Sequence, residues 1–155
     1  MSVSAEARID IDAALAEVWA IILDLPRYGA WNPFVVGIDG PSTAPGSVLR
    51  VRARWEDGGD NVVRVVVTRA EPPAADATGT LRATLAYELI GALPRLGLLR
   101  SRRTQSLTQA PNGPTRYESR EDFEGLMRAF VPRAKVQRGF EVHAAALKAR
   151  AESGG

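Results

Sequence analysis

The segment from Glu17 to Phe34 constrains the fold of this chain most strongly. An apolar helical pattern runs into Pro-Arg-Tyr-Gly, and Trp-Asn-Pro-Phe then opens a stretch with the alternation of a strand. Trp19 and Trp31, two of the three tryptophans, both lie on this bent helical piece rather than inside a sheet. A bent helical segment of this kind can close the open end of a curved sheet. The segment therefore indicates a cavity, but it does not identify what the cavity binds.

The helical part of this segment divides into two short helices. Asp12 is expected to be the N-cap of the first helix, because its carboxylate can accept orphan backbone N–H groups. Pro26 cannot continue that helix but suits the first turn of a second one. Trp19 is expected to be a core residue. The buried face of the first helix is predicted from helical spacing: Leu15, Val18, Trp19 and Ile22.

Most of the remaining chain alternates with period two, which predicts antiparallel strands. The clearest case is Val48 to Trp55, where apolar side chains alternate with three arginines, as on a strand with one wet face. A last hairpin is expected around Asn112-Gly113, and pairing Leu107 with Tyr117 places Arg103 opposite Glu121. Strands are predicted at about 3–11, 34–39, 48–55, 62–68, 81–89, 104–108 and 115–123.

A long helix is predicted from about Val131 to Glu152, with an apolar stripe that includes Phe140 and Leu147. The element order is therefore strand, two short helices, six strands and a long helix. An antiparallel sheet of this length twists and curls, and the long helix can lie in the curl. We expect an α+β fold with space between sheet and helix where the inward side chains are short.

Composition narrows the class of protein. The chain has 155 residues and is expected to form a single domain over residues 1–155. It has no cysteine, which excludes thiol catalysis and thiolate metal sites. The 20 Lys and Arg residues against 18 Asp and Glu leave too small a surplus to predict nucleic-acid binding. No apolar run is long enough to insert stably in a membrane. Because the first residues do not form a secretion signal either, we expect a cytoplasmic protein.

Three parts of the sequence resemble a known superfamily. These are Val18-Trp19 through Trp31-Asn32-Pro33-Phe34, the ending Glu121-Asp122-Phe123-Glu124-Gly125-Leu126, and Ala146-Leu147-Lys148 on the last helix. Together they resemble the START-like, or SRPBCC, superfamily, and especially its bacterial polyketide cyclase/dehydrase and lipid transport branch. The resemblance covers about Val3 to Glu152. It implies the helix-grip fold, in which a seven-stranded antiparallel sheet wraps a long C-terminal helix around a hydrophobic cavity.

The resemblance does not choose a function, because members include carriers, aromatase/cyclases and proteins without an assigned role. One pair of positions departs from the usual pattern of the family. The superfamily usually has histidine and phenylalanine where this chain has Arg103 and Gln105. Polar groups are therefore expected in a wall that is normally apolar.

Four residues are candidates for chemistry in that wall. Arg103 and Glu121 should either form a structural ion pair or bind the oxygen of a ligand, since an unpaired buried charge is costly. Glu121 is then a candidate proton acceptor, and Tyr87 a candidate hydrogen-bond donor. His143, the only histidine, either faces the cavity as a base or is packed in the core. No phosphate loop or metal-ligand spacing is present, so no cofactor and no metal are expected.

The ligand-binding set also includes large side chains expected to line the cavity. The segment from Ile90 to Leu99 is unusually apolar for a connection, and it either forms an exposed patch or packs beneath the long helix. The entrance is expected between this segment, the turn at Trp31 and the start of the long helix. The full predicted set is Trp31, Phe34, Trp55, Tyr87, Arg103, Gln105, Glu121, Phe123, Met127 and Phe130.

The leading hypothesis is the binding of a small hydrophobic molecule, such as a lipid, polyketide or aromatic compound, between sheet and helix. An aromatase/cyclase-like enzyme is the first alternative, because folding a poly-β-keto chain needs little beyond shape and one or two proton-transfer groups. The second alternative is a protein-interaction module that uses residues 90–99, with a homodimer as one arrangement.

Overall fold

The computed structural model describes residues 2–154 and consists of one antiparallel sheet curled around a long helix. The sheet has seven strands in the order β1-β7-β6-β5-β4-β3-β2. This is the predicted helix-grip architecture, and the predicted element order is confirmed apart from two short helical elements, at 92–95 and 128–130, that the sequence did not predict. The strands are β1 (Val3–Ile11), β2 (Val35–Asp39), β3 (Val48–Arg54), β4 (Asp60–Ala75), β5 (Leu81–Leu89), β6 (Arg100–Gln109) and β7 (Thr115–Glu124).

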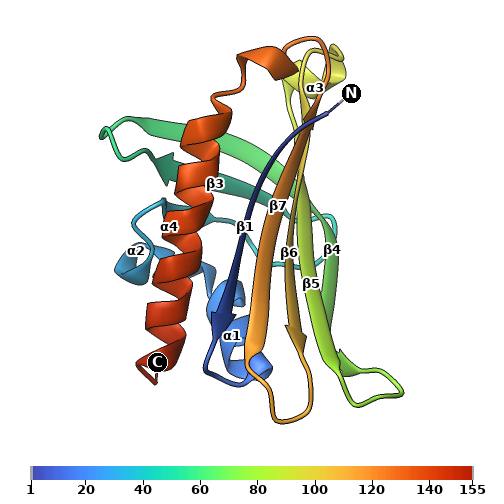
Figure 1. Ribbon diagram of the computed structural model, residues 1–155. Helices are drawn as coiled ribbons and strands as arrows, with labels where there is room; N and C mark the ends of the chain where they lie inside the picture. The colour runs from blue at the N-terminus through green and yellow to red at the C-terminus, as the bar shows by residue number, and fades with distance from the viewer. Residues whose placement is uncertain (1, 155) are drawn as a thin grey trace.

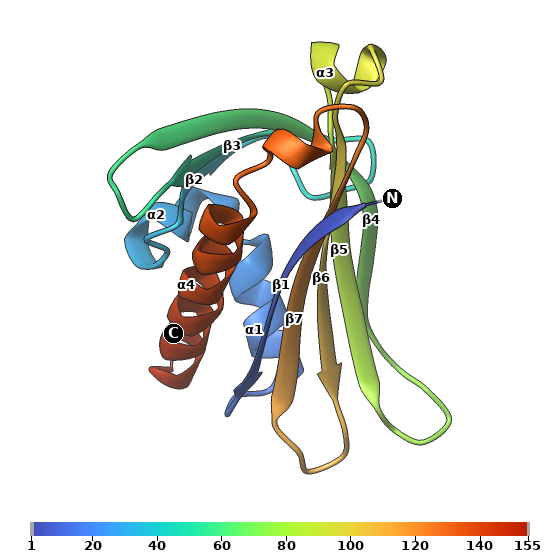
Figure 2. The same ribbon diagram turned by 45° about the horizontal axis from the view of Figure 1, so that its top comes forward.

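The last helix, α4, lies across the concave face of the sheet beside β1, and the β3–β4 hairpin curls over its beginning (Figure 1). Figure 2 shows α3 beyond the end of the sheet, near the connection between β7 and α4. The helical elements are α1 (Leu15–Leu23), the 3-10 turn η1 (Leu25–Arg27), α2 (Tyr28–Trp31), α3 (Ala92–Arg95), the 3-10 turn η2 (Arg128–Phe130) and α4 (Arg133–Glu152).

Side chains of α4 satisfy the free backbone edge of β1. The Gln137 amide accepts a hydrogen bond from the Glu6 N–H at 2.9 Å and donates one to the Glu6 carbonyl. Lys148 donates to the carbonyl of Asp10 at 2.8 Å. An open sheet edge is otherwise free to pair with another chain, so these contacts both close the edge and fix the helix against it.

Two details of the first helix differ from the sequence-based expectation. Asp12 is not the N-cap; that position is Ala14, whose side chain makes no cap hydrogen bond. The N–H of Leu15 is bonded instead by the side-chain oxygen of Gln109 on β6, at 3.0 Å. A residue distant in sequence therefore replaces the local cap. Trp19 is buried at 7% exposure in the core, as predicted.

Strand β4 extends well beyond the predicted end at Thr68. Its pairing with β5 shifts register twice, between Val67 and Arg69 and between Glu71 and Ala74. The second irregularity contains Pro72 and Pro73, which cannot donate to a regular ladder but are tolerated where pairing is interrupted. The prolines therefore mark a bulge in a long strand rather than its end.

The last hairpin has the predicted register. Leu107 pairs with Tyr117, and Arg103 pairs with Glu121. Residues 110–114 connect the strands, with Asn112 in the left-handed region at φ 61°. The Asn-Gly pair thus marks the turn, although it does not form a two-residue hairpin.

Candidate functional site

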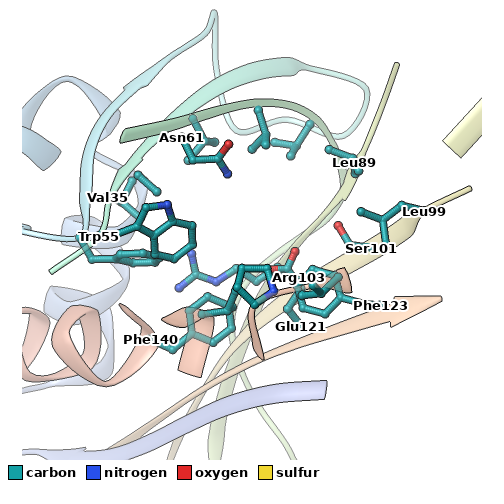
Figure 3. A pocket seen from close by; sticks show the side chains of 18 of the residues that line it. Val35, Trp55, Asn61, Leu89, Leu99, Ser101, Arg103, Glu121, Phe123 and Phe140 are labelled. Carbon is teal, nitrogen blue, oxygen red and sulfur yellow. The ribbon is translucent and has the colours of Figure 1, made fainter. Parts of the chain in front are cut away.

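A cavity of about 430 Å³ lies between the curled sheet and α4. Its size falls in the range of cavities that hold small organic molecules. Most of the wall is apolar, and it is built from β2 to β7, the 127–132 connection and α4 (Figure 3). The apolar side chains of the wall are Phe34, Val35, Val51, Ala53, Trp55, Val63, Val65, Leu89, Leu99, Phe123, Met127, Phe130, Val131, Val136 and Phe140.

Small side chains on the inner face explain why the space is left open. Val51 and Ala53 alternate with exposed arginines along β3, so their short side chains point inward. On the helix, Gly139 lets Phe34 lie directly against α4: a Cβ at Gly139 would stand 2.3 Å from the Cε1 atom of Phe34. The Phe34 ring packs in turn on Trp55 and Phe140, with centroids 5.6 Å and 6.2 Å away.

The polar end of the cavity is centred on Arg103, which is only 4% exposed. Its Nε donates to the Ser119 hydroxyl at 3.0 Å, and its Nη1 donates to the Tyr87 hydroxyl at 3.1 Å. The guanidinium lies over the ring of Phe140, 4.4 Å from the centroid, an arrangement typical of a cation–π contact (Figure 3). Its Nη2 atom is buried and has no hydrogen-bond partner within residues 2–154.

Arg103 and Glu121 form the predicted cross-strand pair, but they do not form the ion pair that was one of the two alternatives. Arg103 directs its bonded nitrogens to Ser119 and Tyr87 and stacks toward α4. Glu121 lines the same cavity. Burial raises the pKa of the Glu121 carboxyl, and the charge of Arg103 opposes that rise. Burial also raises the pKa of Tyr87, which keeps its hydroxyl protonated at neutral pH.

His143 is fully buried and does not line the cavity. Its Nδ1 is 2.8 Å from the side-chain nitrogen of Asn32, whose oxygen accepts the N–H groups of Phe34 and Val35. That arrangement fixes the Asn32 amide as the donor, so the His143 proton is on Nε2. Burial and the charge of Arg103 hold the pKa of His143 well below its usual range. The packed alternative is therefore the one the structure shows.

Eight of the ten predicted ligand-binding residues line the cavity, and Trp31 and Gln105 do not. The expectation for Trp31 is corrected because α2 turns the indole toward Tyr28 and His143, with ring centroids 5.0 Å and 5.8 Å away. Gln105 instead accepts a hydrogen bond from the Tyr117 hydroxyl at 2.7 Å in the core. The eight are Phe34, Trp55, Tyr87, Arg103, Glu121, Phe123, Met127 and Phe130.

Sequence reasoning missed several contributors to this region, among them Phe140, Asn32 and Gly139. Phe140 belongs to the predicted apolar stripe of the last helix, and a stripe that faces a cavity also lines it. Asn32 was part of the Trp-Asn-Pro motif, but no local signal connects it to His143, 111 residues away. Gly139 carries a signal that could have been used, since a glycine inside a helix often marks a close approach of another group.

The mouth of the cavity combines lining residues that are also exposed. Asn61 on β4, Met127 and Phe130 line the cavity and are exposed, with Phe130 80% exposed, so they mark its mouth. The 90–99 segment is next to this mouth, because the Met127 N–H donates to the Leu98 carbonyl at 2.8 Å. Leu96 is 69% exposed, so the patch alternative, rather than packing beneath α4, describes this segment. The mouth does not include Trp31.

Comparison with solved structures identifies the same fold at low sequence identity. The di-domain ARO/CYC protein BexL matches with a TM-score of 0.72 at 18% identity, over 97% of this chain and 50% of that one. The Zhui aromatase/cyclase from Streptomyces matches with a TM-score of 0.71 at 16% identity, over 98% of this chain and 94% of that one. A START superfamily protein from Mycobacterium smegmatis matches with a TM-score of 0.68 at 18% identity, over 98% of this chain and 99% of that one. The chain spans about half the length of the di-domain proteins.

No curated protein matches the sequence. None of the helices within residues 2–154 is long and apolar enough to cross a membrane. The family described as "Polyketide cyclase / dehydrase and lipid transport" matches residues 2–152, which is nearly the whole chain. This match over nearly the whole chain shows that the chain belongs to the polyketide cyclase/dehydrase and lipid transport family.

Proposed function

We propose that the protein binds a small hydrophobic molecule in the cavity between sheet and α4. The observation that carries this proposal is the apolar space of about 430 Å³ at the centre of the fold. Protein interiors are normally packed with few voids larger than a water molecule. Burial of apolar ligand surface supplies affinity at about 25 cal/mol per Å² before the costs of association are subtracted.

Ligand entry is proposed at the mouth between Asn61 and the 127–130 segment. The segment carries the most exposed apolar side chain of the wall, Phe130, and rests on the 90–99 segment through a single backbone hydrogen bond at Leu98. A short connection of this kind can move without disturbing the sheet. The β3–β4 hairpin borders the other side and is tied to α4 by Lys135–Asp57 and Arg138–Glu56 ion pairs at 2.7 Å and 3.0 Å.

The test is native mass spectrometry of the purified protein, followed by extraction and identification of any bound compound. A fluorescent apolar probe then measures binding to the emptied protein. Ala53→Leu is the informative variant, because Ala53 lines the cavity and a larger side chain there occupies ligand space. Loss of probe binding in this variant supports the proposal. Equal binding by the variant and the wild type would place the probe outside the cavity and contradict it.

An aromatase/cyclase-like activity is the second candidate, favoured by the position of Glu121. Its carboxyl shares one end of the cavity with the donors Arg103 and Tyr87. A carboxylate can remove a proton from carbon next to a carbonyl while the donors stabilise the enolate oxygen. Glu121→Gln and Tyr87→Phe are expected to abolish turnover of a poly-β-keto mimic while the proteins stay folded. Unchanged turnover would remove Glu121 from the mechanism.

The exposed apolar side chains beside the mouth favour a third candidate, a protein contact. Leu96, Leu126 and Phe130 are 69%, 77% and 80% exposed and lie on the two segments that meet at Leu98. A homodimer through this surface is proposed as its simplest form. Sedimentation of the wild type and of Leu96→Ser checks it: a dimer that becomes a monomer in the variant supports the contact, and a monomeric wild type refutes it.

A further inference from the structure

The polar end of the cavity contains unused hydrogen-bond donors. Arg103 uses Nε and Nη1 on Ser119 and Tyr87, and its buried Nη2 has no partner within residues 2–154. The Tyr87 hydroxyl accepts from Nη1, and no described residue accepts its hydrogen. Nη2 and the Tyr87 hydroxyl are thus donors with no acceptor, and both residues line the cavity. An unpaired buried donor is costly, so the site is built for an acceptor that the chain does not supply.

The positive charge of Arg103 at this end of the cavity also has no negatively charged hydrogen-bond partner among residues 2–154. Arg103 is buried and permanently charged, and none of its nitrogens bonds a carboxylate of residues 2–154. Glu121 faces it across the strands without bonding it. Burying a charge without a partner is costly, so buried charges are normally paired with an opposite charge. A ligand that brings its own negative oxygen meets both requirements, whereas a hydrocarbon meets neither.

The remaining geometry limits how such an oxygen is held. The guanidinium is stacked on Phe140, so a partner approaches along its edge rather than over that face. The single hydrogen of Nε is donated to Ser119, which excludes a two-nitrogen fork through Nε, whereas Nη2 keeps both of its hydrogens for a ligand. The second donor is the Tyr87 hydroxyl beside it.

We propose that the ligand has an apolar body that fills the cavity and one anionic oxygen head, a carboxylate or a phenolate, which Arg103 Nη2 and the Tyr87 hydroxyl bind. This inference rests on the proposed ligand-binding function and specifies the ligand class. The arginine that departs from the family pattern then determines which apolar molecules are accepted.

The test compares ligands with the same apolar body and different heads. The carboxylate is 2-naphthoate, and its uncharged twin is 2-methylnaphthalene. The phenolate is a nitrated naphthol that is ionised at neutral pH, and its twin is the methyl ether. Dissociation constants are measured by calorimetry or probe displacement. At least one anion is expected to bind the wild type about tenfold to a hundredfold tighter than its twin, the effect of a charged hydrogen bond. The anion that binds more tightly shows whether the site prefers a carboxylate or a phenolate.

Three variants attribute that preference to the site. Arg103→Met is expected to bind each anion no more tightly than its uncharged twin. Its affinity for the uncharged twins should stay within about threefold of the wild-type affinity. Arg102→Met is the matched control, since Arg102 is the next residue of β6 but is exposed and paired with Glu88. It should behave as the wild type. Tyr87→Phe removes only the hydroxyl donor and provides the test if Arg103→Met does not fold; its preference for the anion should fall about tenfold.

The outcomes separate the two proposals. If the uncharged twins bind the wild type and neither anion binds tighter, the cavity holds a neutral ligand and the anionic head is refuted. The same conclusion follows if the anion preference persists in both Arg103→Met and Tyr87→Phe. If no compound of either series binds the wild type, the ligand-binding function itself fails.

Discussion

Gly139 on α4 gives a prediction whose magnitude follows from the structure. In the substitution Gly139→Ala, the new Cβ would stand 2.3, 2.5 and 2.6 Å from three ring carbons of Phe34. Carbon atoms in contact normally lie about 3.5 Å or more apart, so the ring must move by about 1 Å. Asn32 holds the Phe34 backbone, and Trp55 packs against its ring. The ring therefore moves toward the cavity, which it lines.

Two opposing terms set the change in stability. Alanine favours a helix interior over glycine by about 1 kcal/mol. Overpacking of a filled core costs about 1–3 kcal/mol. We therefore expect the free energy of unfolding of Gly139→Ala to fall by about 0–2 kcal/mol. Affinity for a cavity probe should fall at the same time, because the displaced ring occupies ligand space.

A double-mutant cycle in urea isolates the contact. In the Phe34→Leu background the clash with the ring is absent, so Gly139→Ala should stabilise the protein by about 1 kcal/mol. The expected coupling energy is therefore about 1–3 kcal/mol. If Gly139→Ala stabilises the wild type by the full helical gain and leaves probe affinity unchanged, the ring does not depend on the missing Cβ, and the reasoning is refuted.

Three further predictions concern the core and the hairpin. His143 has a depressed pKa when folded, whereas the unfolded chain binds its proton at about 6.5; stability should therefore fall as the pH drops below about 6.5, by up to about 1.4 kcal/mol per pH unit. Urea melts at several pH values should show this slope, and His143→Gln should flatten it. Tyr117→Phe should cost about 1–3 kcal/mol in urea, because it leaves the buried Gln105 oxygen without its donor. Asp57→Asn breaks one of the two exposed pairs between the hairpin and α4, so stopped-flow probe release should accelerate about two- to fivefold with little change in Tm.

Matched controls make these results specific. A pH slope that persists in His143→Gln would assign the slope to another group. A loss in Tyr117→Phe that disappears when Gln105 is replaced by Leu would confirm the pair, since the unsatisfied oxygen is then gone. For the hairpin, high salt should speed probe release from the wild type but not further from Asp57→Asn/Glu56→Gln. Equal salt effects on both proteins would refute the role of the ion pairs.

The sequence predicts the fold well because local patterns and the pairing of strands agree. Alternation along 48–55 and the register of Leu107 with Tyr117 both follow from period two and one buried face. The cap on α1 was mispredicted, since Gln109 lies 94 residues away from the Leu15 N–H that it binds. The extension of β4 was missed because two prolines normally end a strand, and only the bulge in its partner pairing admits them.

The sequence predicts which residues form the candidate site better than it predicts the directions of their side chains. Facing positions on β6 and β7 identify Arg103 and Glu121 as inward, but strand register does not determine side-chain direction. Ser119 on β7 and Phe140 on α4 draw the guanidinium away from Glu121, and the contact with Phe140 depends on where α4 crosses the sheet. Trp31 was misplaced for a similar reason, because the orientation of α2 places its ring against His143.

The two ends of the cavity stand on parts of the sheet with different mechanical support. Tyr87 and Arg103 belong to β5 and β6, which have paired strands on both sides, whereas Phe34 and Trp55 lie at the β2–β3 border. Substitutions at the border can lengthen or shorten the space for the ligand body without moving the donors. The scaffold is therefore modular: a library at Val51 and Ala53 should alter the length of the accepted chain or ring system, while the chemistry of the accepted head stays the same.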